Sequence, residues 1–155
     1  IINAPMGLAS SGRTSEIAMQ LRLWAKKDGT GTTFDSNGQF RLPNGAARSP
    51  DASWVLLPRW NALSKEEQEA FAPLCPDFVL ELRSPSDRVK TLQKKMQEYL
   101  ANGARLGWLI DPFEKMVHVY RPDREPEILN HPPTVSGETV LPGFVLELGE
   151  IYARE

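Results

Sequence analysis

The sequence predicts an α/β fold in which helices flank a mixed central β-sheet. Apolar residues at helical spacing first mark a helix over residues 15–27. The stretch from 78 to 110 then has the pattern of a buried strand, an amphipathic helix and a second buried strand. Short strands precede and follow this unit, so we expect a mixed sheet rather than a regular doubly wound one.

The first half of the chain is expected to alternate helix and strand. Ile17, Leu21 and Trp24 share one helix face, and Asp28-Gly29 supplies a stop. Ser64 and Glu67 have the spacing of a capping box. The expected elements are the helix over 15–27, capped by Thr14 or Ser15, two short strands around a turn at 35–38, a strand over 51–58 that Pro58 ends, and a helix over 64–71.

The central unit begins with FVLEL, residues 78–82, which is apolar on both faces apart from Glu81. Ser84, Pro85 and Asp87 have the spacing of a helix start. The apolar stripe of that helix runs over 89–100, and Asn102-Gly103 ends it. A second buried strand follows at 106–110, and further strands are expected at 116–121, near 126–129, near 138–141 and at 144–148.

Composition limits the class of protein more than its function. The 155 residues, with no repeat and no long linker, predict one domain over 1–155. No apolar run is long enough for a membrane span. Cys75 is the one cysteine, so neither an internal disulfide nor a cysteine zinc site is expected, and a cytoplasmic setting is the simplest inference. A net charge of −2 neither indicates nor excludes nucleic acid as a partner.

An acidic pair is the main candidate for chemistry. A carboxylate inside a buried strand is costly unless a cation or hydrogen-bond donors meet it, so Glu81 is either an ion-pair partner of Arg83 or Arg88 or a metal ligand. If the strand that Asp51 heads pairs antiparallel with 77–83, the two acids converge. Asp77 shares a strand with Glu81 at a separation of roughly 13 Å, too far to share one ion easily.

Two lysines follow on the helix after Glu81. On a helical wheel Lys95 flanks the buried stripe and can lean over the sheet, whereas Lys94 points away and is expected in solvent. Hydrolysis of a phosphodiester needs charge stabilisation and an activated water near the metal, which a lysine can assist. Tyr99 is expected to pack in the core, with its hydroxyl directed toward this site.

These motifs resemble a known family. SPDASWV, PDFVLELRSPSD, KMQEYLANG, GWLIDP, VYR and LPGFVLEL, from about residue 14 to the end, are similar to the Uma-type family of putative restriction endonucleases, which has the PD-(D/E)XK nuclease fold. The Pro-Asp of the nuclease pattern matches Pro50-Asp51 and its central acid matches Glu81. Its usual lysine falls at Arg83, and the resemblance carries the lysine role to Lys95.

The resemblance implies Mg²⁺-dependent (Mn²⁺ being possible) cleavage of DNA by a homodimer. It places the metal on Asp51 and Glu81 and a supporting acid at Glu16. Arg83 could hold a phosphate, although it could not act as a base. Two alternatives stay open: a non-catalytic DNA-binding or assembly module that kept the fold, and hydrolysis of a small phosphoester.

Overall fold

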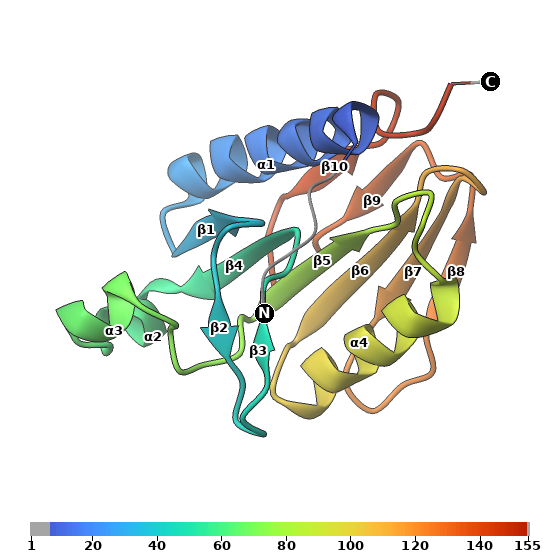
Figure 1. Cartoon of the computed structure of the whole chain (residues 1–155). Helices are drawn as coiled ribbons and strands as arrows, with labels where there is room; N and C mark the ends of the chain where they lie inside the picture. The colour runs from blue at the N-terminus through green and yellow to red at the C-terminus, as the bar shows by residue number, and fades with distance from the viewer. Residues whose placement is uncertain (1–6, 155) are drawn as a thin grey trace.

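The centre of the molecule is a six-stranded mixed sheet (Figure 1). The computed structural model describes residues 7–154. In sheet order the strands are β1 (Gly31–Asp35), β4 (Ala52–Leu56), β5 (Phe78–Leu82), β6 (Leu106–Asp111), β7 (Met116–Tyr120) and β8 (Glu127–Asn130). Only the pairing of β5 with β6 is parallel. The strand–helix–strand unit predicted from the sequence therefore supplies the parallel pair.

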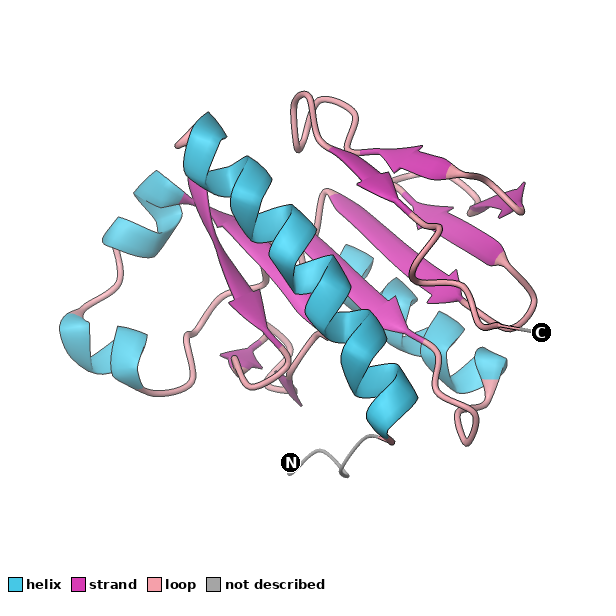
Figure 2. Ribbon diagram, turned by 90° about the horizontal axis from the view of Figure 1, so that it is seen from above, coloured by secondary structure: helices cyan, strands magenta, loops and turns pink. Residues whose placement is uncertain are grey.

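The helices and small sheets form a layer on each face of this sheet (Figures 1 and 2). On one face lie α1 (Leu8–Asp28) and the paired strands β9 (Thr134–Ser136) and β10 (Val145–Glu147). On the other lie α4 (Val89–Ala101) and the hairpin of β2 (Phe40–Arg41) with β3 (Ala47–Arg48). The short helices α2 (Leu57–Asn61) and α3 (Lys65–Glu69) follow β4. Each face has its own hydrophobic cluster.

The unit from β5 to β6 is packed tightly because its sequence permits close approach. All five residues of β5 are buried, and Leu92, Met96 and Tyr99 bury one face of α4. A Cβ on Gly107 of β6 would lie 2.6 Å from Met96 Cε, so the glycine lets α4 lie close to the sheet. The helix ends at Asn102, as predicted, and Gly103 follows in the left-handed region with φ 113°.

The first helix begins well before the predicted start at residue 15. Its N-cap is Gly7 rather than Thr14 or Ser15. The residues that precede 15 include serine and glycine, which are weak helix formers, so propensity alone favours a loop there. Ser10 is nonetheless buried and its hydroxyl meets that of Ser84, so tertiary packing extends the helix.

The pairing of strands also differs from expectation around the turn at 35–38. The strands on either side of the 35–38 turn exist, but β2 pairs with β3 across Asn44-Gly45 rather than with β1. The strand predicted over 51–58 ends earlier, at Leu56, because Pro58 lies in the first turn of α2. Ser64 and Glu67 do form the predicted capping box of α3.

Two further predictions were wrong. The N-cap of α4 is Arg88, not Ser84. Ser84 and Asp87 instead close a separate turn, in which the Ser84 N–H donates to the Asp87 carboxylate and the Asp87 N–H donates to the Ser84 carbonyl. The segment 138–141 is a turn rather than a strand, and β9 lies before it. Gly137 permits that turn, since a Cβ there would lie 2.6 Å from the Leu141 carbonyl oxygen.

Over residues 7–154, no helix has the length and apolar character needed to span a bilayer.

Candidate active site

Two carboxylates converge where β4 begins and β5 ends. The strands pair antiparallel with Ala52 opposite Leu80, which sets Asp51 beside Glu81. Asp51 Oδ2 accepts a hydrogen bond of 2.7 Å from the Leu82 N–H. Strand pairing therefore brings together two acids that are 30 positions apart in the sequence, as the antiparallel register assumed from the sequence requires.

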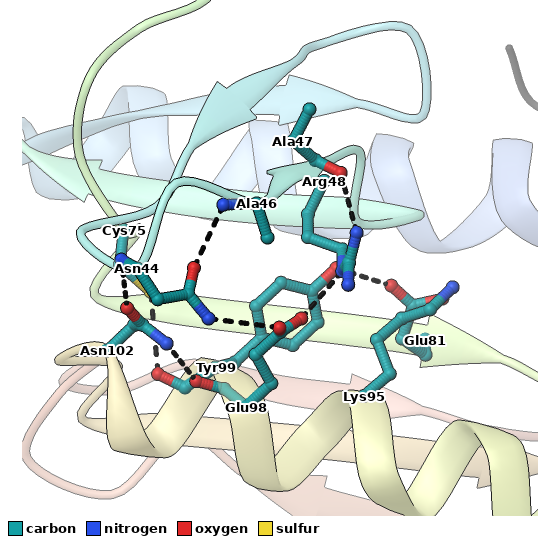
Figure 3. Close-up of polar contacts among 10 residues, drawn as sticks. All are labelled: Asn44, Ala46, Ala47, Arg48, Cys75, Glu81, Lys95, Glu98, Tyr99 and Asn102. Carbon is teal, nitrogen blue, oxygen red and sulfur yellow. Dashed lines mark hydrogen bonds and ion pairs between the residues drawn. The ribbon is translucent and has the colours of Figure 1, made fainter. Parts of the chain in front are cut away.

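Helix α4 provides the partners of Glu81 (Figure 3). The Glu81 carboxylate is buried, and the Tyr99 hydroxyl donates to its Oε2 at 2.9 Å. Lys95 Nζ lies 3.6 Å from its Oε1. Lys95 and Tyr99 are one helical turn apart, so both side chains reach the same carboxylate from one face of the helix. The predicted lean of Lys95 toward the sheet is confirmed.

Burial disfavours the ionised form of both acids. Burial, followed by repulsion from Asp51, raises the pKa of Glu81 to about 8, although Lys95 and the Tyr99 hydrogen bond oppose the rise. Burial likewise raises the pKa of Asp51 to about 6, against the opposing Leu82 N–H. A bound cation would relieve both effects.

An open cavity of about 680 Å³ gives access to the pair. Its wall includes α1, the β4 and β5 ends, the turn at 84–87 and α4. The lining residues are Gly7, Ser11, Thr14, Ser36, Asn37, Ser49, Asp51, Glu81, Leu82, Ser84, Pro85, Ser86, Asp87, Leu92 and Lys95. A substrate group can therefore approach the carboxylates from solvent.

Glu16 and Arg83 are not brought to this cavity. Glu16 accepts a hydrogen bond from Gln20, whose amide also donates to the carbonyl of Glu147 on β10. Helix α1 reaches the cavity through Ser11 and Thr14 instead. Arg83 Nη1 pairs with Asp111 at 3.0 Å and its Nε donates to the Asp87 carbonyl, so its guanidinium is engaged outside the cavity lining.

Asp77 lies at the opposite end of β5, as its separation from Glu81 predicts. Its carboxylate accepts the Leu56 N–H at 2.9 Å and pairs with Arg59 at 3.0 Å and with Arg105 at 3.7 Å. The residue is buried. These contacts tie β4, α2 and the start of β6 together, which makes Asp77 structural.

Sequence reasoning missed Asp87 as a member of the site. This acid lines the cavity, and its charge contributes to the raised pKa of Asp51. The sequence signal was present in SPSD, but the spacing from Ser84 to Asp87 was interpreted as a helix cap. The polar cluster around Arg48 and Glu98, beside Lys95, was also missed, because no local pattern connects those two positions.

The donor set suits a divalent ion that prefers oxygen. Asp51 and Glu81 supply carboxylates from adjacent strands, and Mg²⁺ is commonly held by one or two carboxylates together with water and substrate phosphate. Within residues 7–154, no cluster of three or more His, Cys, Asp or Glu side chains is placed to hold a metal. The remaining coordination would therefore come from water, main chain or substrate.

Comparisons with known proteins agree with this fold. The family model Uma2, described as "Putative restriction endonuclease", matches residues 1–149. A crystal structure of "a putative nuclease belonging to DUF820" from Anabaena variabilis superposes with a TM-score of 0.82 at 24% identity, over 97% of this chain and 83% of that chain. Among curated proteins, none matches. The predicted restriction-endonuclease-like fold is confirmed, and the chain belongs to the Uma2 family of putative restriction endonucleases.

Proposed function

We propose that this protein is a metal-dependent endonuclease that hydrolyses phosphodiester bonds of DNA. The observation that carries the proposal is the convergence of Asp51, Glu81 and Lys95 at one open cavity in a chain of this family. Both carboxylates have raised pKa values chiefly because they are buried, and a cation would stabilise their ionised forms.

Asp51 and Glu81 would hold the ion, with Mg²⁺ as the expected cation and Mn²⁺ as a substitute. The Leu82 N–H fixes the orientation of Asp51, and the Tyr99 hydroxyl fixes that of Glu81. When bound, a divalent ion lowers the pKa of a coordinated water and offsets charge on the phosphate. The two acids thus act by position and charge.

Lys95 is the positively charged side chain of the site. Its Nζ lies over Glu81 at the cavity wall, where it can orient the attacking water and donate to a phosphate oxygen. Glu16, which the resemblance offers as a supporting acid, is not included in this mechanism because its carboxylate does not line the cavity. A homodimer, also implied by the resemblance, would present one site to each strand of a duplex.

The alternative is a nuclease-fold module that binds nucleic acid without cutting it. The position of the usual lysine holds Arg83, whose guanidinium is paired with Asp111 rather than directed into the cavity. Retention of Asp51, Glu81 and Lys95 as one spatial group favours catalysis. One experiment separates the two accounts.

The experiment titrates Mg²⁺ and Mn²⁺ by calorimetry and follows plasmid nicking in the same buffer. Glu81→Gln is expected to abolish metal binding and nicking together. Lys95→Gln is expected to keep metal binding and to slow nicking by about 10² or more, since it removes a group that acts on the reacting atoms. Glu69→Gln, the same charge change at an exposed position of α3, should leave both unchanged.

If the wild type binds no ion at millimolar concentration and cuts no DNA, the carboxylates are not a hydrolytic centre. The non-catalytic module then becomes the better description.

A further inference from the structure

A second cavity adjoins the catalytic one along α4. Its volume is about 320 Å³, and residues of the β2–β3 hairpin and of α4 line it. Ser49 and Lys95 line both cavities, so the two adjoin at these residues. The lining residues of the second cavity are Gln39, Ala47, Arg48, Ser49, Thr91, Lys94, Lys95 and Glu98.

The two cavities carry opposite charge. The catalytic cavity is lined by Asp51, Glu81 and Asp87 against the single cation Lys95. In the second cavity, two further cations (Arg48 and Lys94) face one carboxylate, that of Glu98, and Lys95 is shared with the first cavity. A metal-binding acidic centre beside a cationic cavity complements a substrate with more than one phosphate group.

Arg48 is held in position by α4 (Figure 3). Its Nε donates to Glu98 Oε1 at 2.6 Å, and its Nη1 donates to the Ala47 carbonyl at 2.9 Å. Asn44 Nδ2 donates to the other Glu98 oxygen, and the Asn44 N–H donates to Asn102. These bonds fasten the hairpin to the helix, so the guanidinium is oriented before any substrate arrives.

Arg48 and Lys94 can both still contact a ligand in this second cavity. Arg48 still exposes 27% of its side chain beside Glu98. Lys94 is exposed, and over residues 7–154 no ion pair engages it. The exposed Lys94 that the sequence assigned to solvent therefore lies at the rim of a cationic cavity one residue from Lys95.

We propose that this second cavity binds a phosphate of the nucleic-acid backbone adjacent to the phosphate that is cleaved, with Arg48 and Lys94 as the contacts. The inference rests on the proposed function and favours a nucleic-acid polymer over a small phosphoester as its substrate. A small phosphoester would occupy the catalytic cavity alone, whereas a polymer places a second phosphate in the adjoining cationic cavity. Guanidinium groups suit this role because they bind phosphate in a fixed geometry.

The test measures binding of a fluorescein-labelled DNA duplex by anisotropy, in EDTA and over a series of salt concentrations. Each phosphate contact contributes about 0.9 to the slope of log K against log salt for duplex DNA. Lys94→Gln is expected to lower the slope by about 1, and Arg48→Gln by a similar amount. Lys27→Gln, the same charge change in the last turn of α1, should leave the slope unchanged.

Because EDTA removes the metal, binding and cleavage are scored separately. Suppose that the wild type nicks DNA in Mg²⁺ but that Lys94→Gln and Arg48→Gln show the same slope of log K against log salt as Lys27→Gln. The proposed phosphate site is then wrong, whereas the proposed nuclease function is supported. If the slopes fall as expected but nothing is cut, the site stands on a non-catalytic binder. A wild type that neither binds nor cuts DNA overturns both proposals. Lys94→Gln changes an exposed side chain, so its result does not depend on refolding.

Discussion

At the scale of single residues, burial and a neighbouring carboxylate determine the electrostatics of Glu81. Glu81 accepts a hydrogen bond from Tyr99 and forms an ion pair with Lys95, while the carboxylate of Asp51 lies beside it. Desolvation is the largest cause of its raised pKa, and Asp51 is the next. The folded protein therefore holds Glu81 ionised only at a cost to its own stability, a feature found often at functional sites.

The raised pKa of Glu81 predicts the effect of Glu81→Gln on protein stability in the absence of metal. A carboxyl group with a raised pKa binds its proton more tightly when folded, so its stabilising effect is present below the unfolded pKa and is lost as pH rises toward about 8. The free energy of unfolding of Glu81→Gln minus that of wild type should therefore increase by about 1 to 3 kcal/mol from pH 5 to pH 8. Urea unfolding in EDTA at both pH values measures it.

Glu69→Gln serves as the control for that comparison, because the side chain lies at an exposed position. A difference between Glu81→Gln and wild type that stays constant from pH 5 to pH 8 would mean that Glu81 is not the titrating group.

At the scale of elements, β5 carries an acid at each end with a separate role. Glu81, near the carboxyl end, faces α4 and the cavity. Asp77, just before the strand, is engaged by Leu56, Arg59 and Arg105. The strand thus separates a carboxylate held by two arginines from one that lines the cavity.

Asp77→Asn should lower the free energy of unfolding by about 1 to 3 kcal/mol, because it weakens a buried group with three partners. Both arginine partners are partly exposed, so solvent moderates the loss. Metal affinity should not change. Urea unfolding and calorimetric Mg²⁺ titration measure the two quantities, and a folded variant with weakened metal binding would refute the division of roles.

At the scale of the whole molecule, the layers depend on close approach at the edge of the sheet. A Cβ on Gly31 of the edge strand β1 would lie 2.2 Å from the buried Trp54 ring. The indole packs in the same cluster as Ile17 and Leu21 of α1. The glycine therefore allows helix, edge strand and β4 to meet.

Gly31→Ala is expected to destabilise the protein by about 1 to 3 kcal/mol, because a rigid buried ring would have to move. Gly12→Ala is the matched control: it lies within α1 and a Cβ there meets nothing within 4 Å. That variant should gain about 0.5 to 1 kcal/mol. Thermal unfolding compares the pair, and equal effects would contradict the packing account.

The sequence by itself determined the central unit and the core of the site. Hydrophobic patterning identified the buried strands and the helix between them, since period and length are local properties. It also pointed to Glu81 and Lys95, because an acid in an apolar strand and a lysine beside an apolar stripe are visible without coordinates. Asp51 followed only from the assumption that its strand pairs antiparallel with that of Glu81.

Only the tertiary structure decided which other residues join that core. Ser84 and Asp87 have a pattern that fits either a helix cap or an isolated turn, and the packing of Ser84 against Ser10 accompanies the turn. The pairing of Arg83 with Asp111, and of Arg48 with Glu98, joins positions 28 and 50 residues apart. Such contacts depend on strand order and helix placement, which arise from burial summed over the whole chain rather than from any local stretch.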